Sequence, residues 1–125
     1  MDNKHIKDIL FRRKDTLASL VLDTLEHNPK GMKRVKLVTA VTSWPWDQTS
    51  DRRVRKAIKR LRDLGLVILS STQSSGYRLA GPEDTAAVQA YADQQMRAAK
   101  SRMATARKVQ KAYGLRNVVP MDLSG

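Results

Sequence analysis

The stretch from residue 48 to residue 65, QTSDRRVRKAIKRLRDLG, combines a narrow apolar stripe with a dense cluster of charge. Its apolar positions recur at the spacing of a single helical face, and they are Val54, Ala57, Ile58, Leu61 and Gly65. Ser50 is a suitable N-cap, and Asp51 places a negative charge in the positive first turn. Gly65 is expected to end the helix. The stretch therefore predicts a helix over residues 50–64 whose apolar face packs into a core.

The remaining faces of this predicted helix are nearly all positive. Only Asp51 and Asp63 oppose its basic residues, which are Arg52, Arg53, Arg55, Lys56, Lys59, Arg60 and Arg62. The chain of 125 residues has a formal net charge of +12, and residues 49–80 carry half of this excess, with eight basic and two acidic residues. A helix face that serves only solubility normally mixes both signs. Charge concentrated in one place predicts a polyanionic partner.

Composition and motifs argue against several classes of protein. The chain has no cysteine, so disulfides and thiolate metal sites are excluded, and its two histidines lie in different predicted elements. There is no glycine-rich phosphate loop, metalloprotease motif or nucleophile elbow, so we expect no enzyme, no cofactor and no metal. No apolar run is long enough to span a membrane, and the N-terminus lacks the pattern of a secretory signal. These features predict a cytoplasmic protein without a membrane partner.

Shorter elements flank the basic helix. DTLASLVLDTLEHNPKG predicts a helix that stops at Pro29 and Gly31, and KRVKLVTAVTS predicts a second, shorter helix with valines at three-residue steps. SWPWDQTS breaks this second helix, because Pro45 disfavours helical backbone at Trp44. After the basic helix, LVILS predicts a buried strand, STQSSG a polar turn and YRLA a returning strand. The predicted fold is mainly α with a small β-hairpin, of the α+β class.

A long helix is expected after the hairpin. PEDTAAVQAYADQQMRAAKSRMATARKVQKAYG begins with a strong helix start at Pro82 and ends at Gly114. A stripe with the three-four spacing of a heptad runs along it, formed by Ala92, Met96, Ala99, Met103, Ala106, Gln110 and Tyr113. Two interpretations of this stripe are open. It forms a homodimer through residues 88–113, or it packs against the segment 17–25 of the same chain.

These elements divide the chain into four predicted parts. Residues 1–14 are an N-terminal helical extension, and residues 15–81 form the domain that contains the basic helix and the hairpin. Residues 82–114 form the long C-terminal helix. The final segment, 115–125, shows no clear period and is expected to be a mobile tail.

The segment SDRRVRKAIKRLRDLGLVILSSTQSSGYRLA resembles the recognition helix and wing of small prokaryotic and bacteriophage winged helix-turn-helix proteins. In such proteins a capped basic helix ends in Leu-Arg and a glycine, and is followed by an apolar strand, a serine-rich wing and a returning strand like GYRLA. The resemblance covers residues 15–82, and its specific part is 50–80. The turn SWPWDQ is longer than in the simplest helix-turn-helix units, which affects the angle at which the basic helix is presented. The resemblance implies binding to double-stranded DNA in a bacterial host cell, at the nucleoid.

Candidate contact residues follow from placing the helix 50–64 in the major groove. They are Lys33, Arg34, Thr49, Ser50, Arg52, Arg53, Arg55, Lys56, Lys59, Gln73, Ser74, Ser75 and Arg78. Arg52 and Arg53 are expected to read guanine edges, because a guanidinium can donate two parallel hydrogen bonds there. Lys33 and Arg34 are expected to hold the phosphate backbone at the start of the second helix. Arg78 is expected to anchor the wing.

Other functions remain open from the sequence. The main expectation is a sequence-specific regulator of transcription or replication. The alternatives are a non-specific, architectural binder of nucleic acid, or a winged-helix adaptor that binds protein, because a fold alone does not determine function. Simpler roles are expected for some residues: Arg60 and Arg62 as surface pairs or packed stems, and Trp44 and Trp46 as plugs of the core and the turn.

Overall fold

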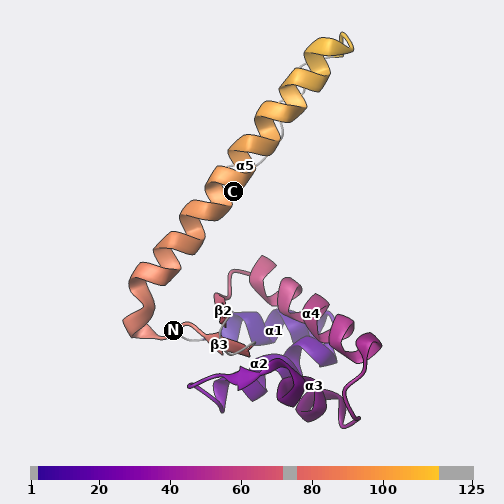
Figure 1. Cartoon of the computed structure of the whole chain (residues 1–125), viewed down its shortest axis with the longest axis vertical. Helices are drawn as coiled ribbons and strands as arrows, with labels where there is room; N and C mark the ends of the chain where they lie inside the picture. Colours follow the sequence, from indigo (N-terminus) through magenta and orange to yellow (C-terminus); the bar gives the residue numbers. More distant parts are fainter. Residues whose placement is uncertain (1–2, 72–75, 116–125) are drawn as a thin grey trace. The chain divides into compact units, whose positions relative to one another are not determined.

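The computed structural model describes residues 3–71 and 76–115 (Figure 1). It is mainly α-helical with a small antiparallel sheet, as the sequence predicts. In chain order the elements are α1 (Lys4–Arg12), α2 (Thr16–Glu26), β1 (Met32–Lys33), α3 (Arg34–Thr42), α4 (Gln48–Asp63), β2 (Ile68–Ser71), β3 (Gly76–Leu79), the 3-10 turn η1 (Pro82–Asp84) and α5 (Thr85–Ala112). Packing divides the chain into two units, residues 1–88 and 89–125.

One hydrophobic core unites the four helices of the first unit. Helix α2 packs against α1, α3 and α4, and its side chains at Val21, Leu22 and Leu25 are fully buried. Burial of such aliphatic side chains is the main source of stability for a domain of this size. The helix therefore occupies the centre of the unit, with the other three around it.

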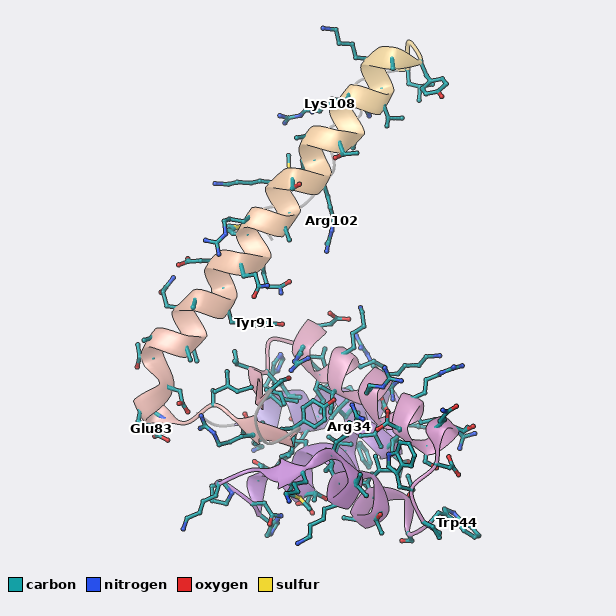
Figure 2. The ribbon with its side chains drawn as sticks, in the orientation of Figure 1. Arg34, Trp44, Glu83, Tyr91, Arg102 and Lys108 are labelled. Atoms are coloured by element: carbon teal, nitrogen blue, oxygen red, sulfur yellow. The ribbon has the colours of Figure 1, made fainter. Side chains whose placement is uncertain are left out.

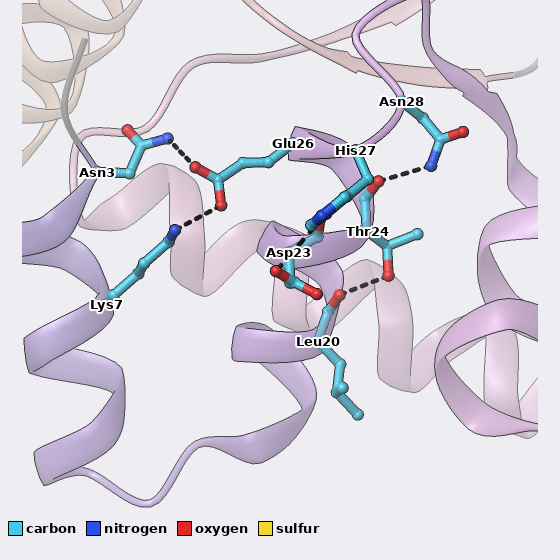
Figure 3. Close-up of polar contacts among 8 residues, drawn as sticks. All are labelled: Asn3, Lys7, Leu20, Asp23, Thr24, Glu26, His27 and Asn28. Carbon is cyan, nitrogen blue, oxygen red and sulfur yellow. Dashed lines mark hydrogen bonds and ion pairs between the residues drawn. The ribbon is translucent and has the colours of Figure 1, made fainter.

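Helix α1 belongs to this core, although the sequence places residues 1–14 in an extension. Ile6 and Leu10 are one helical turn apart on α1, and both are buried in the same cluster as the residues of α2 to α4. Polar contacts also join α1 to α2 (Figure 3): Lys7 Nζ lies 2.7 Å from Glu26 Oε1, and Asn3 Nδ2 donates to Glu26 Oε2 at 3.2 Å. Apolar and polar contacts together fix α1 on the domain.

The sheet has three strands in the order β1-β3-β2. The β2–β3 hairpin is as predicted, with Ile68 opposite Leu79, and buried Ile68 joins it to the helical core. Strand β1 is additional, and pairs Met32 with Tyr77. A two-residue strand carries no periodic signal, so the sequence did not reveal it. The close approach of β1 requires Gly76, because a Cβ there would lie 2.6 Å from the carbonyl oxygen of Met32.

Helix α4 begins earlier than the sequence suggested. Its N-cap is Asp47, whose side chain accepts a hydrogen bond from the backbone N–H of Ser50 at 2.7 Å, so the expected cap at Ser50 is wrong. That hydrogen bond holds the pKa of Asp47 below its ordinary value. The predicted apolar face is confirmed, since Val54, Ala57, Ile58 and Leu61 are buried, and Gly65 follows the helix with a φ of +97°. Backbone of this left-handed kind favours glycine and stops the helix.

Helix α5 is uninterrupted over 28 residues, and none of them is buried. Its length agrees with the predicted long helix. Within residues 3–71 and 76–115, no helix is both long and apolar enough to cross a membrane. The predicted wing tip at Gln73, Ser74 and Ser75, and the tail from residue 116, lie outside the described residues.

Candidate nucleic-acid interface

Packing of α4 on the core orients its positive side chains toward solvent. The buried residues lie on one side of the helix, so the remaining sides present five exposed cations, called here the cationic face: Arg52, Arg53, Arg55, Lys56 and Lys59. Arg52, Arg53 and Lys56 form no hydrogen bond or ion pair with any residue that the structure describes. Lys59 pairs with Asp63 across 3.2 Å in an exposed pair of little strength. The cationic face therefore keeps most of its charge available for an anion.

Asp51 organises the beginning of this face. Its side chain is only 6% exposed, and its carboxylate lies 3.0 Å from Arg34 Nε and 2.9 Å from Arg55 Nε. It also accepts a hydrogen bond from the indole nitrogen of Trp46 at 3.2 Å. A buried carboxylate is stable only when it is paired in this way. Asp51 thus links the start of α3, the α3–α4 turn and the first turn of α4.

This linkage brings together arginines that are distant in the sequence. Arg34, Arg52 and Arg55 line one surface pocket with Trp46 and Gln48, and Asp51 lies in the same lining. Arg34, labelled in Figure 2, is exposed at the start of α3. Because Asp51 binds the Nε groups of Arg34 and Arg55, it limits the orientations that these two guanidinium groups adopt. Guanidinium groups held in this way suit the oxygens of a phosphate.

Three further candidate residues lie at the starts of α3 and α4. Lys33 directly precedes α3, and Thr49 and Ser50 lie in the first turn of α4. Lys33 is the N-cap of α3, is exposed, and forms no ion pair with any part of the chain that the structure describes. Thr49 is exposed in the first turn of α4, whereas Ser50 is partly buried there. The structure therefore leaves Lys33 and Thr49 accessible, while the backbone N–H of Ser50 is used by the Asp47 cap.

Arg78 has a structural partner that the sequence did not reveal. Its guanidinium group donates two hydrogen bonds to Asp84, at 2.7 and 3.1 Å, and Asp84 also accepts from the backbone N–H of Gly81 at 2.7 Å. These contacts fasten β3 to η1. The hydrogen bonds from Arg78 hold the pKa of Asp84 below its ordinary value. Arg78 therefore anchors the end of the hairpin through an internal ion pair, and its expected contact with DNA stays a prediction.

The expectation that Arg60 and Arg62 are structural is confirmed. Arg60 donates from Nε and Nη2 to the two oxygens of Asp15, at 2.7 and 3.0 Å, which joins α4 to the N-cap of α2. Arg62 donates to the carbonyl oxygen of Ile68 at 2.6 Å and to Ser70 Oγ at 2.9 Å. The hydrogen bonds from Arg60 hold the pKa of Asp15 below its ordinary value. Both arginines are thus engaged within the domain.

The two tryptophans are not plugs of the core, contrary to expectation. Trp44 is 69% exposed and Trp46 is 39% exposed. Helix α3 ends at Thr42, and its C-cap Ser43 has a left-handed φ of +58° that turns the chain away from the core before Trp44. Trp44 projects from the end of the α3–α4 turn (Figure 2). Only the spacing of Trp46 before Asp51 hinted at their hydrogen bond, and such spacing alone is not a recognisable motif.

Taken together, these residues form a compact site on the first unit. It consists of the cationic face of α4, the Arg34 guanidinium beside it and the exposed Lys33, and it can bind an extended anion through several phosphates. No model of a protein family, no curated protein and no solved structure matches this chain.

Proposed function

We propose that this protein is a double-stranded DNA-binding regulator that inserts α4 into the major groove. The observation that carries the proposal is the two-sided character of α4. One side is fully buried, and the other exposes Arg52, Arg53 and Lys56, which form no hydrogen bond or ion pair with the described residues. An α-helix fits the major groove of B-DNA, and its N-terminal half normally reaches the base edges.

The order of elements supports a winged helix-turn-helix. Helices α2 and α3 precede the basic helix α4, and the β2–β3 hairpin follows it at once. The pairing of β1 with β3 ties the hairpin to the start of α3. This arrangement keeps the hairpin close to the helices that would border the DNA.

Different residues serve base reading and phosphate binding in this proposal. Arg52 and Arg53 lie in the N-terminal half of α4, where two parallel hydrogen bonds to guanine would give sequence preference. Arg34 and Arg55, whose Nε groups are held by Asp51, would bind phosphates and set the depth of α4 in the groove. Lys56, Lys59 and Lys33 would add contacts to the backbone.

A non-specific, architectural binder is the second candidate, and α5 is the observation that favours it. Six exposed cations lie between the middle of α5 and its C-terminal end, namely Arg97, Lys100, Arg102, Arg107, Lys108 and Lys111. None of them has an acidic partner among the described residues. Phosphate contacts from such a helix would lengthen the footprint on any duplex without reading its sequence.

The test is selection from a pool of random duplexes at near-physiological salt, followed by sequencing of the retained DNA. We expect enrichment of a motif. Retention without a motif would favour the architectural binder, and no retention would point to a protein adaptor, because so basic a surface should bind duplex DNA under these conditions.

Two variants of equal charge separate the roles of the helices. The α4 triple variant is Arg52→Ala/Arg53→Ala/Lys56→Ala, and the α5 triple variant is Arg97→Ala/Lys108→Ala/Lys111→Ala. Both remove three exposed cations that form no hydrogen bond or ion pair with the described residues. The α4 triple variant should lose preference for the motif while its far-UV circular dichroism is retained. The α5 triple variant should bind all duplexes more weakly and keep the preference; the reverse pattern would overturn the assignment of α4.

A further inference from the structure

Helix α5 contributes no residue to the buried core of the part of the chain that the structure describes. None of its 28 residues is buried, and Met96 is 61% exposed. Most helices in proteins owe their stability to packing of one face rather than to intrinsic propensity. A helix of this length with an organised apolar stripe therefore requires a partner, and the order of residues along the stripe indicates which one.

Large and small side chains alternate along the stripe. In a heptad numbering, the a positions are Met96, Met103 and Gln110, and the d positions are Ala92, Ala99, Ala106 and Tyr113. The exposed cations Arg97, Lys108 and Lys111 lie on the opposite side of the helix. The polar and apolar sides of α5 are thus separated, as in a helix that pairs along one seam.

We propose that α5 forms an antiparallel coiled coil with α5 of a second copy of the chain. In an antiparallel pair, a positions meet d positions, so each methionine would face an alanine of the other copy. Met96 would pack on Ala106 of the second copy, and Met103 on Ala99. Facing large and small residues give layers of even volume. A parallel pair would instead alternate methionine–methionine layers with alanine–alanine layers, which leave voids.

Charge on the flanking positions favours the same direction. Asp93 and Arg107 both occupy e positions, and the antiparallel register brings Asp93 of each copy beside Arg107 of the other. Near the centre of the pair, Lys100 would lie beside Lys100 of the second copy, and Arg102 beside Arg102 of the second copy. Repulsion between these like charges opposes pairing at low salt. A parallel pair would juxtapose Arg102 with Arg107 twice and would gain no attractive pair. Antiparallel pairing is therefore the better match of charge, and salt should strengthen it by screening the central repulsion.

The direction of pairing determines how far apart the two helix starts lie, and the consequence for DNA binding rests on the proposed function. The register is centred on Ser101, so the two Thr85 residues at the helix starts would be separated by about 48 Å at 1.5 Å per residue. A parallel pair would place both starts at the same end. The antiparallel dimer thus suits two separated half-sites, or two separate duplexes, rather than adjacent half-sites.

Disulfide cross-linking of the full chain without DNA tests the pairing, because the natural sequence has no cysteine. Ala92 and Gln110 would face each other across the seam, although they lie about 27 Å apart within one helix. An equal mixture of Ala92→Cys and Gln110→Cys chains should therefore yield mainly mixed disulfide dimers on mild oxidation. Intact-mass measurement distinguishes the mixed dimer from either homodimer.

A matched control uses Gln94→Cys and Lys108→Cys, which would lie at the same height but on the outer sides of the pair. This mixture should form at least tenfold less cross-linked dimer. Homodimers of Ala92→Cys or Gln110→Cys as the main product would establish parallel pairing and overturn the proposal. Equal cross-linking in the control, or no cross-linking together with a monomer mass in light scattering at high concentration, would overturn it as well. DNA is absent throughout, so these outcomes are independent of the proposed function.

Discussion

Replacement of Asp51 by Asn probes the residue that organises the start of the cationic face. The side chain keeps its size but loses its charge and one of its two acceptor oxygens, so Arg34, Arg55 and Trp46 no longer share a carboxylate. A hydrogen bond to a charged group contributes about 1.5–3 kcal/mol when it is buried. The two arginine side chains are 44% and 55% exposed, so water screens each pair and lowers its contribution to about 1 kcal/mol. With the indole hydrogen bond included, Asp51→Asn should lower the free energy of unfolding by about 2–3 kcal/mol.

The assay is urea unfolding at neutral pH followed by far-UV circular dichroism, in which this loss shifts the midpoint by about 1 M. Asp63→Asn is the matched control on the same helix. Asp63 is 64% exposed and pairs only with Lys59 among the described residues, so its loss should cost at most about 0.5 kcal/mol. Equal effects of the two substitutions would refute the reasoning that Asp51 is a buried link between α3 and α4.

Three further outcomes follow from the packing of the domain. Hydrogen bonds from Arg60 lower the pKa of Asp15, so the stability that this pair provides is present at neutral pH and is lost as the pH falls below about 4. In urea unfolding, Asp15→Asn should therefore reduce the fall in the free energy of unfolding between neutral and acid pH. Arg60→Ala should lower the free energy of unfolding by about 1–2 kcal/mol and leave duplex affinity in fluorescence anisotropy nearly unchanged. Gly76→Ala should cost about 2–3 kcal/mol because its Cβ meets the Met32 carbonyl, whereas Gly65→Ala, with open space around it, should cost only about 1 kcal/mol of backbone strain in thermal unfolding.

Elements with strong periodicity were predictable from the sequence. The apolar face of α4 and the long helix α5 both have many residues at regular spacing, so each pattern has a single structural solution. The hairpin was predictable from an apolar run followed by a polar turn. By contrast, β1 has two residues and exists only because Gly76 admits its backbone. Tertiary contact, rather than local preference, decides such an element.

The candidate site was predictable as a charged helix face but not as a set of contacts. The sequence shows that Arg52, Arg53 and Lys56 lie on the polar side of α4. It does not show that Asp51 is buried, because a carboxylate in a first helical turn is already explained by the helix dipole. Nor does it show that Arg78 is paired with Asp84, since that contact depends on how η1 follows the hairpin. Partner choice among charged residues requires the folded geometry.

The most direct test of the central claim is the salt dependence of duplex binding by the wild type and the α4 triple variant, measured by fluorescence anisotropy. If six to eight phosphates are neutralised, the logarithm of the wild-type association constant should fall with the logarithm of salt concentration at a slope of about −5 to −7. Loss of Arg52, Arg53 and Lys56 should make that slope about 2–3 units shallower. An unchanged slope would show that the cationic face of α4 does not contact DNA and would contradict the account.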